Sequence, residues 1–461
     1  MSQTTPQSSF AALLPLLLFL GIFIGTGVAL TASGTNMAFY QLSATVAIMP
    51  AIALALLQGG VGRGRLQKKI TIFLTGAGEL NIMTMCMIYL LAGGFAAVAT
   101  AIGSVQATVN FGLSLVPPSF ILPGLFIVGA FVSTAMGTSM GTVAAITPIA
   151  LGVAAQTNIE IPLLMGVVLG GAMFGDNLSM ISDTTIAATR TQGCEMGDKF
   201  RMNFAIALPA ALLTAVLLWL TGANGTQVQL ADYNFIKVLP YLTVLILALL
   251  GLNVFVVLAA GIVFSGAVGL LLGVDAQTSY SALRWAQDIY KGFTGMNEIF
   301  VLSMLIGGLG ELIRFHGGIA WLLERVDALS RLLARGKKAT TRAGEFCIGL
   351  LVSLADICTA NNTVAIILTG SMAREIAEKN GIDPRRSASL LDIFSCVFQG
   401  LIPWAAQLLL AGSLAKISPL EIAMNNWYCM LLAVAGAAAV MLGRPRAPAS
   451  RPARLQTTGE A

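Results

Sequence analysis

Long, uninterrupted runs of apolar residues recur from one end of this sequence to the other. Two examples are "FAALLPLLLFLGIFIGTGVAL" (10–30) and "LTVLILALLGLNVFVVLAAGIVFSGAVGLLLG" (242–273). Each run is long enough for one or two helices across a hydrocarbon core of about 30 Å. Only helices and closed barrels satisfy their own backbone hydrogen bonds in lipid, and runs of this length indicate helices. The sequence therefore predicts an all-α polytopic membrane protein.

The composition supports this class. Of the 461 residues, 56% are hydrophobic and only 10% are charged, and the mean hydropathy is +0.84, which leaves no room for a soluble domain. The run at 10–30 lacks a basic flank and a small-residue cleavage site, so we expect a retained span and not a signal peptide. The six cysteines are scattered without metal spacing, which indicates packing residues. We expect no cofactor.

The apolar runs and polar breaks predict about fourteen crossings, with both termini in the cytoplasm of a cell with an inner membrane. In this topology the cytoplasmic segments are 61–69, 190–201, 314–342, 374–386 and the tail from Arg444. They hold 22 of the 26 Lys and Arg residues, as the positive-inside rule requires. The net charge of +5 thus reflects orientation in the bilayer, and no nucleic-acid partner is expected. The predicted centres are near residues 20, 50, 90, 127, 147, 175, 213, 244, 263, 302, 350, 368, 400 and 433.

An internal repeat links the two halves of the chain. "TSMGTVAAI" (138–146) aligns with "TANNTVAII" (359–367), so that Thr138 matches Thr359. Seven predicted crossings separate the copies, and this odd number predicts two inverted-topology repeats, the architecture of many secondary transporters. The alternative is a chance match between two helices rich in Ala, Thr and Val. The predicted divisions are 1–115 (N-terminal membrane helices), 116–225 (first repeat core), 226–340 (linking helices and a basic loop), 341–443 (second repeat core) and 444–461 (a basic, disordered cytoplasmic tail).

Each repeat contains a stretch that interrupts its helix: "TAMGTSMGT" (134–142) and "DICTANNT" (356–363). Unwound backbone in a membrane is tolerated where it lines a cavity or binds a ligand. Carbonyl, hydroxyl and amide oxygens suit a small alkali cation, whereas half-helix N-termini favour an anionic group. The breaks therefore predict an ion or substrate site near the midplane. Its predicted lining residues are Thr138, Ser139, Thr142, Asn177, Thr359, Asn361, Asn362 and Thr363.

Acidic residues occur in the apolar segments without basic residues among them. Because an unpaired carboxylate in hydrocarbon is costly, each must be protonated, hydrated or facing a cation. Asp176, Asp183 and Asp356 are the predicted cation or proton sites, with Glu79, Asp392, Gln399 and Gln407 as secondary candidates. Simpler roles stay open: Glu79 and Glu298 as interfacial residues, Asp392 as a hydrogen-bonded buried carboxylate, Glu311 paired with Arg314, and His316 as an interfacial residue.

Three stretches resemble the NhaC-type Na⁺/H⁺ antiporter family of the ion transporter superfamily. They are "GTSMGTVAAITPIALGVA" (137–154), "GGAMFGDNLSMISDTTIAAT" (170–189) and "RRSASLLDIFSCVFQGLIPWAAQLLLAGS" (385–413). The resemblance implies a cation site made by Asp176, Ser182, Asp183 and Thr184, with Asn361, Asn362 and Thr363 opposite. Members of the family commonly carry His where this chain has Asn177, so pH sensing by that residue does not carry over. The family also includes carriers of organic acids and amino acids.

Our main hypothesis is a Na⁺/H⁺ antiporter in which Na⁺ and H⁺ compete for Asp176 and Asp183 during alternating access. The alternative is a Na⁺-coupled or H⁺-coupled carrier of an amino acid or small carboxylate, bound at the break containing Asn361 and Asn362; the lack of an embedded Arg weighs against it. An intramembrane enzyme is disfavoured, because no HExxH, GxSxG or paired His/Cys pattern occurs. The expected partners are the lipid bilayer, Na⁺ and H⁺, and a homodimer stays open.

Overall fold

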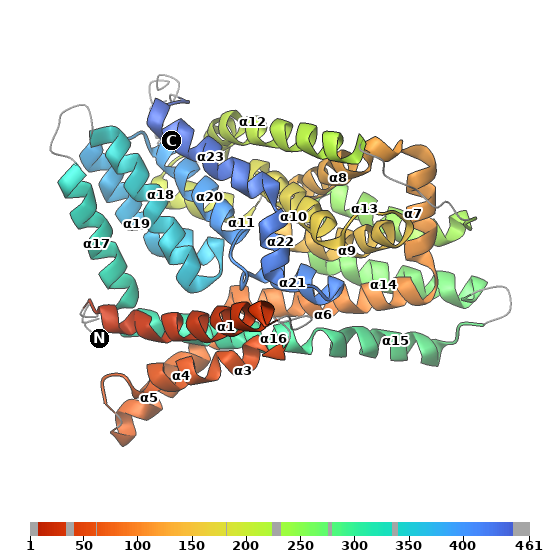
Figure 1. Ribbon diagram of the computed structural model, residues 1–461, viewed down its shortest axis with the longest axis horizontal. Helices are drawn as coiled ribbons and strands as arrows, with labels where there is room; N and C mark the ends of the chain where they lie inside the picture. Colours follow the sequence, from red (N-terminus) through yellow and green to blue (C-terminus); the bar gives the residue numbers. More distant parts are fainter. Residues whose placement is uncertain are drawn as a thin grey trace, which may run out of the picture.

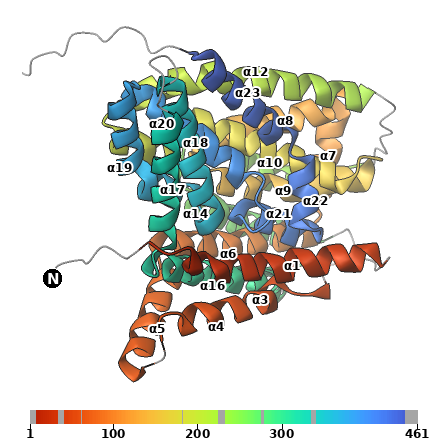
Figure 2. The same cartoon turned by 60° about the vertical axis from the view of Figure 1, so that its left-hand side comes forward.

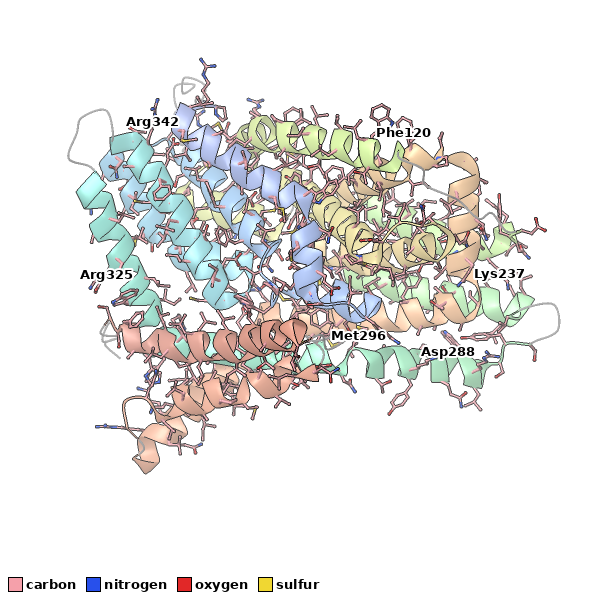
Figure 3. The ribbon with its side chains drawn as sticks, in the orientation of Figure 1. Phe120, Lys237, Asp288, Met296, Arg325 and Arg342 are labelled. Carbon is pink, nitrogen blue, oxygen red and sulfur yellow. The ribbon has the colours of Figure 1, made fainter. Side chains whose placement is uncertain are left out.

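A computed structural model describes residues 8–33, 41–60, 62–180, 182–223, 232–274, 279–333 and 340–445. Within these ranges the regular elements are all helices, which confirms the predicted all-α class. The predicted tail at 444–461 lies outside the described residues beyond residue 445. Many long helices follow the long axis of the molecule (Figure 1). Arg325 and Arg342 lie at one end of this axis, and Lys237 and Asp288 at the other (Figure 3), so the long axis is the natural membrane normal.

One side of the molecule is a layer of helices outside the two repeats. Its members α1, α3, α4, α5 and α16 stay below the repeats in both views (Figures 1 and 2). The elements of this part and of the flanking helices are η1 (Phe10–Leu13), α1 (Leu14–Ala32), α3 (Ala44–Ala47), α4 (Met49–Leu57), α5 (Arg63–Ala77), α6 (Leu80–Ala101), α7 (Ser104–Leu115), η2 (Pro118–Phe120), η3 (Phe235–Val238), α13 (Leu239–Leu249), α14 (Val254–Leu272), α15 (Ala282–Gly295), α16 (Asn297–Phe315) and α17 (Gly318–Leu333).

The two repeats make up the rest of the structure. The first consists of α8 (Ile121–Met136), α9 (Ser139–Gln156), α10 (Ile161–Leu178), α11 (Asp183–Gln192) and α12 (Met196–Ala223). The second consists of α18 (Thr340–Thr359), α19 (Asn362–Asn380), α20 (Pro384–Gln399), α21 (Ala406–Ala415), α22 (Pro419–Asn425) and α23 (Trp427–Leu442). In each repeat, the first helix pair is broken near its middle and the second pair is joined by a non-helical segment.

The helix caps define the register between the repeats. The N-cap residues Thr138 and Asn361 begin α9 and α19, and the left-handed residues Gly193 and Lys416 end α11 and α21. Both pairs have the same separation along the chain, so the structure matches Thr138 with Asn361, whereas the sequence alignment matched it with Thr359. The sequence alignment was wrong by two positions because it matched similar residue types. The structural register between the repeats follows instead from the residues that cap α9 and α19.

Fewer of the described helices have the length and hydropathy of a full crossing than the number of crossings that the sequence predicted. Among the described residues, eight helices are long and apolar enough to cross, or nine if the bent pair α22–α23 counts as one span. The prediction of about fourteen is too high by this criterion. The predicted centres near 50 and 244 lie in shorter apolar helices at 44–57 and 235–249. An apolar run therefore reports burial in the membrane but not the length of the helix inside it.

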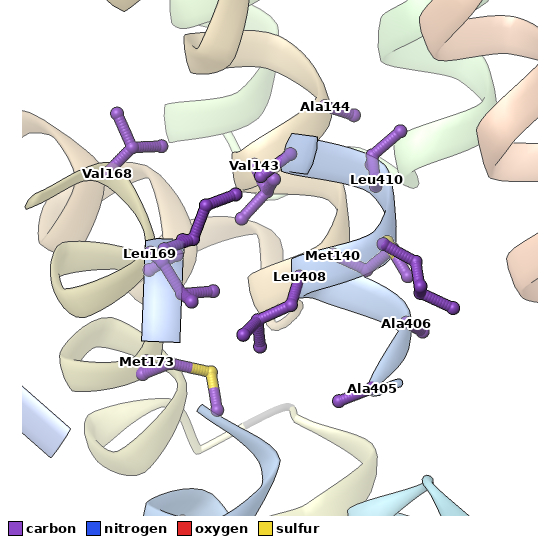
Figure 4. Close-up of a cluster of buried hydrophobic side chains, with 14 of the residues drawn as sticks. Met140, Val143, Ala144, Val168, Leu169, Met173, Ala405, Ala406, Leu408 and Leu410 are labelled. Atoms are coloured by element: carbon purple, nitrogen blue, oxygen red, sulfur yellow. The ribbon is translucent and has the colours of Figure 1, made fainter. Parts of the chain in front are cut away.

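Apolar contacts join the two repeats next to the helix breaks. Side chains of α9, α10 and α21 form one buried cluster, which includes Met140, Leu169, Met173 and Leu408 (Figure 4). The buried face of α21 thus packs on the first repeat although α21 belongs to the second. This packing brings the polar residues at the ends of these helices together.

Candidate functional site

The first helix break is built by a glycine and a threonine. Gly137 ends α8 in the left-handed conformation with a φ of 69°, which glycine adopts without a steric cost. Thr138 then caps α9, and its side chain accepts a hydrogen bond from the Gly141 N–H. Thr142 is buried and its hydroxyl donates to the Thr138 carbonyl (3.0 Å). The break predicted from "TAMGTSMGT" is therefore present, and it places the N-terminus of α9 beside the end of α10.

Asp176 lies in the last turn of α10 and is 6% exposed. The Ser182 hydroxyl donates to its Oδ1 (2.6 Å), and the Ser139 hydroxyl donates to its Oδ2 (3.0 Å). In the part of the chain that the structure describes, no Lys or Arg forms an ion pair with it. Asp176 is thus a buried acid held by two hydroxyl groups, each from a different helix break.

Ser182 and Thr184 belong to the same cluster. Ser182 occupies the N-cap position of α11, yet its hydroxyl bonds Asp176 and lies 2.7 Å from the Thr184 hydroxyl instead of capping the helix. Both residues are buried. The predicted residues Asp176, Ser182, Thr184 and Ser139 therefore come together and present a carboxylate and three hydroxyl oxygens, which are hard ligands suited to Na⁺.

A chain of hydrogen bonds links this cluster to the second repeat. The Gln407 amide donates to the Ser139 hydroxyl (3.1 Å), and the Gln399 amide donates to Gln407 Oε1 (2.7 Å). Gln399 also donates to the carbonyl of Ala360 (3.3 Å), which lies in the break between α18 and α19. Both glutamines are buried. The two predicted secondary candidates thus connect one helix break to the other.

The second break has the same construction with different residues. Ala360 takes the left-handed conformation (φ 52°), and Asn361 caps α19 by accepting from the Val364 N–H (3.0 Å). The Thr359 hydroxyl donates to the Asn361 carbonyl (3.2 Å), and Asn362 Oδ1 accepts from the Thr363 N–H (3.0 Å). An alanine with positive φ is strained, so the surrounding packing must stabilise this break.

Asp356 lies one turn before the second break and is completely buried. Among the described residues, neither carboxylate oxygen has a hydrogen-bond partner. An ionised carboxylate in this position is strongly unfavourable, so Asp356 carries a proton or faces a cation. It does not share a hydrogen bond with Asp176 and forms a separate acidic position.

The expectation that no basic residue lies among the embedded acids is wrong. Lys199, which the sequence topology placed in a cytoplasmic segment, is fully buried in α12 and forms an ion pair with Asp392 (Nζ–Oδ2 2.8 Å). A second buried pair joins Arg386 to Glu345 (2.9 Å). Asp392 also accepts from the Asn203 amide (2.6 Å), so it is a neutralised carboxylate in an extended polar network.

Asp183 does not join Asp176. It is the first residue of α11 and is exposed, while its neighbours Ser182 and Thr184 point into the cluster. The expectation that both aspartates are sunk out of water thus holds for Asp176 alone. Asn177 is buried and donates to the Tyr428 hydroxyl (3.0 Å).

The remaining acids and the histidine have local partners. Glu79 caps α6 by accepting from the Asn81 N–H (2.8 Å), Glu298 accepts from the Ser43 hydroxyl (2.5 Å), and Glu311 accepts from Arg314 Nε (2.8 Å). His316 Nε2 lies 2.9 Å from the Ala55 carbonyl. Burial lowers the pKa of His316, so it is neutral near pH 7.

Sequence reasoning missed Lys199 because it treated 190–201 as a loop, and it missed Asn203 because the polar face that both residues share begins in that segment. The missing signal was their spacing: four residues apart, they lie on one face of a helix with Met202, Ile206 and Ala207, all of which are buried. A Lys and an Asn on the apolar face of a helix indicate a buried polar partner on another element.

A cavity of about 240 Å³ reaches the second break from the side of α5 and α16. Its polar lining residues come from three places: Glu79 and Asn81 at the start of α6, Glu311 and Arg314 on α16, and Thr359 and Asn361 at the break. The fold and the site together define a polytopic membrane transporter with two broken-helix repeats and a buried acid between them.

Comparison with known proteins supports this class. The model of the Na⁺/H⁺ antiporter family matches residues 4–223. The Malate-2H(+)/Na(+)-lactate antiporter of Bacillus subtilis is 27% identical over 425 residues, covering 85% of this chain and 87% of that protein. The Na(+)/H(+) antiporter NhaC of Bacillus subtilis is 26% identical over 66% of this chain and 71% of its own. The Arginine/ornithine antiporter ArcD of Halobacterium salinarum is 26% identical, over 66% and 67% respectively.

The family model over residues 4–223 and the NhaC relatives support an NhaC-type Na⁺/H⁺ antiporter, as the three sequence stretches indicated. The chain is a multi-pass membrane protein and a secondary antiporter, not an enzyme.

Proposed function

We propose that this antiporter exchanges Na⁺ for H⁺ at Asp176 by alternating access of the two repeats. The observation that carries the proposal is the state of Asp176: it is buried, it has no basic partner among the described residues, and two hydroxyl groups donate to it, one of which also bonds the Thr184 hydroxyl. A carboxylate in this environment needs either a proton or a cation to be stable. Binding of one therefore displaces the other.

The hydroxyl groups give the site a way to serve both ions. A serine hydroxyl donates one hydrogen bond and has two acceptor lone pairs. When no cation is bound, Ser139 and Ser182 donate to the carboxylate, as observed. When Na⁺ binds, the same hydroxyls rotate and turn a lone pair toward the ion, while the Gln407 amide continues to donate to Ser139. The first repeat thus supplies the carboxylate and the hydroxyl groups of the site, and Gln407 of the second repeat supports Ser139.

We also propose that Asp356 is a second proton-binding group. Its buried carboxyl lies one turn before the second break and is stable when protonated. The hydrogen-bond chain through Gln399 and Gln407 begins at Ala360, whose N–H donates to the Asp356 carbonyl (2.7 Å). Movement at one break is therefore transmitted to the other through rigid contacts.

The proposed orientation puts α5, α17 and both termini in the cytoplasm of a cell with an inner membrane. Arg325 and Arg342 lie at this end of the long axis (Figure 3). The basic segments 61–69 and 374–386 are the other support for this orientation, since the positive-inside rule assigns them to the cytoplasm.

A transport assay tests the exchange. In everted vesicles carrying a preformed pH gradient, Na⁺ is expected to collapse the gradient with the wild-type protein and to have no effect with Asp176→Asn. The control is Asp288→Asn: Asp288 also accepts a hydroxyl hydrogen bond, from Tyr280 (2.8 Å), but it lies on α15 away from the cluster. Exchange by Asp176→Asn at the wild-type rate would refute the proposal.

The cavity at the second break favours a second candidate function, exchange of a small organic acid or amino acid. Arg314 supplies a guanidinium group, and Asn361 is 1% exposed with an amide nitrogen whose described partner is the weak acceptor Met85 Sδ at 4.0 Å. The Asn361 amide at the N-terminus of α19 and the Arg314 guanidinium across the cavity, which also pairs with Glu311, are two donors that suit a carboxylate. The names of two relatives, a malate and lactate antiporter and an arginine/ornithine antiporter, describe such substrates for those proteins.

Thermal stabilisation of the purified protein distinguishes the two candidates. Malate, lactate, arginine and ornithine are tested with and without Na⁺, because a ligand of the folded state raises apparent stability. Stabilisation by one of them, lost in Arg314→Gln and retained in Arg325→Gln, would support the organic substrate. Arg325 is the control because it packs on the Trp321 ring, outside this cavity. Stabilisation by Na⁺ alone, with no effect of the four organic compounds, would exclude an organic substrate.

A further inference from the structure

Lys199 has an unusual environment for a lysine. It is among the largest fully buried side chains of the molecule, and its ammonium group has three acceptors: Asp392 Oδ2 (2.8 Å), the Asn177 carbonyl (3.0 Å) and Thr185 Oγ1 (2.6 Å). An ammonium group has three N–H donors, so its hydrogen-bonding capacity is filled. The three acceptors come from α20, α10 and α11.

These contacts hold together the elements that form the cation site. Asn177 directly follows Asp176, and Thr185 follows Thr184 of the hydroxyl cluster. Asn203, one turn after Lys199 on α12, donates to both the Asn177 carbonyl (3.0 Å) and Asp392 (2.6 Å). The ion pair therefore bridges the first repeat, which carries Asp176, to α20 of the second repeat.

The charges near Asp176 are few. Lys199 on α12 and Asp392 on α20 act on it electrostatically. The other titratable groups nearby are the exposed Asp183 on α11, Cys396 on α20 and, on α23, Tyr428, which bonds Asn177, and Cys429, which adjoins Cys396. The ion pair is thus the principal source of fixed charge that Asp176 experiences in the described structure.

We propose that the buried Lys199–Asp392 ion pair is a positioning element of the Asp176 site that sets how tightly this site holds its proton. The inference rests on the proposed exchange at Asp176 and deepens it. Lys199 acts as a resident cation that occupies Asp392 permanently, so that, of these two carboxylates, Asp176 is the one left for the transported ions. The pair also fixes the Asn177 carbonyl and thereby the last turn of α10.

Removing each partner changes the charge near Asp176 in opposite directions. Lys199→Met leaves two carboxylates without a resident cation, and each disfavours ionisation of the other, so protons are held more tightly. Asp392→Asn leaves an uncompensated ammonium group, which favours ionised Asp176. The double variant Lys199→Met/Asp392→Asn removes a neutral pair, and its effect is expected to fall between those of the single variants.

The experiment measures Na⁺-evoked exchange in everted vesicles across a pH series. The pH of half-maximal exchange is expected to rise in Lys199→Met and to fall in Asp392→Asn. Each shift is at least about one pH unit, the effect of a unit charge about 12 Å away at an effective dielectric constant near 20. The double variant is expected to return toward the wild-type value.

A merely structural ion pair would not give shifts of opposite sign. The matched control is the other buried pair, Arg386–Glu345, whose side chains are 4% and 7% exposed. Arg386→Met and Glu345→Gln are expected to lower the amount of folded protein without displacing the pH profile. Profiles of Lys199→Met and Asp392→Asn that coincide with wild type, or that move in the same direction, would overturn the inference.

Two further outcomes can be interpreted separately: a Lys199→Met variant that does not fold, and a wild-type protein that shows no exchange. If Lys199→Met does not fold, an acid shift in Asp392→Asn that the double variant cancels supports the inference, and its absence overturns it. The unfolding temperature of each purified variant, measured against pH, gives the same comparison without transport. A wild-type protein that shows no exchange therefore refutes the proposed function alone, while the stability profiles still decide the role of the ion pair.

Discussion

The two repeats share a backbone plan but place their acids at different points of it. In the register that matches Thr138 with Asn361, Asp176 at the end of α10 corresponds to Gln399 at the end of α20, and Asp356 on α18 corresponds to Ser133 on α8. Ser133 donates to the Ala172 carbonyl (2.6 Å), whereas Asp356 has no described partner. The two repeats thus share their broken helices, but the acidic residues in each repeat lie at positions where the other repeat has a different residue.

The apolar packing shows the same divergence. Phe126 on α8 packs on Gly171 of α10, and the corresponding residues Gly349 and Phe394 pack on each other in the second repeat. The large and the small residue have exchanged places. Gly171 approaches the backbone of Phe126, whereas Gly349 approaches the ring of Phe394, so each repeat uses its glycine for a different kind of close helix contact.

Among changes that compare the two repeats, the largest effect is expected from making them alike at Asp356. Asp356→Ser gives α18 the residue that α8 carries at Ser133. Because this removes the proposed second proton-binding group, exchange in vesicles is expected to fall by about tenfold, equivalent to about 1.4 kcal/mol in the barrier. The fold should persist, since a hydroxyl replaces an unpartnered acid. Exchange at the wild-type rate would assign Asp356 a purely structural role.

The exchanged Phe and Gly positions make a stability comparison. A Cβ at Gly171 would lie 2.4 Å from the Phe126 carbonyl oxygen, whereas a Cβ at Gly349 would lie 2.8 Å from a carbon of the Phe394 ring. A side chain can shift more readily than a backbone carbonyl. Gly171→Ala is therefore expected to destabilise by about 3 kcal/mol and Gly349→Ala by about 1 kcal/mol. Thermal unfolding of the purified variants measures both, and the reverse order would contradict this packing.

A smaller effect is expected at Asp183. This residue is exposed in the first turn of α11, next to the buried cluster but outside it. Asp183→Asn removes a negative charge from a screened position, so the Na⁺ concentration for half-maximal exchange should rise about threefold while the maximal rate stays unchanged. A complete loss of exchange would instead indicate that Asp183 binds the transported ions directly, as the sequence predicted.

The smallest effect compares the helix caps Asp383 and Glu160, which correspond in the same register. Asp383 accepts from the Arg385 N–H (2.9 Å), whereas Glu160 makes no side-chain cap bond. Asp383→Ala should cost about 1 kcal/mol and Glu160→Ala less than about 0.5 kcal/mol. The hydrogen-bonded Arg385 guanidinium lowers the pKa of Asp383. Its contribution is therefore complete above the unfolded-state pKa and is lost as the pH falls through the lowered one, which unfolding measured against pH would reveal.

Much of the fold could be predicted from the sequence because lipid imposes strong constraints. Long apolar runs require helices, and Gly, Thr and Asn within them mark the breaks at Thr138 and Asn361. Asp176 and Ser139 followed from the same reasoning, whereas Ser182 and Thr184 were expected from the resemblance to the antiporter family. The number of helices long enough for a full crossing could not be predicted in this way, since an apolar run does not show where a helix ends.

The missed features depend on side-chain direction and on partners far away in the sequence. Lys199 begins close to a polar segment, and its partner Asp392 belongs to the other repeat, so no local pattern pairs them. Asp183 lies two helical turns beyond Asp176 in the sequence, a spacing that puts both on one face of a continuous helix. The non-helical segment between α10 and α11 breaks that relationship and turns Asp183 outward.

Proton release from the purified protein tests the central claim most directly. In a weakly buffered detergent solution, addition of Na⁺ to the wild-type protein is expected to release protons as the cation displaces them from Asp176. The Asp176→Asn variant should release none from this site, and the Asp288→Asn control should match the wild type. Equal Na⁺-evoked proton release by Asp176→Asn and the wild type would contradict the account.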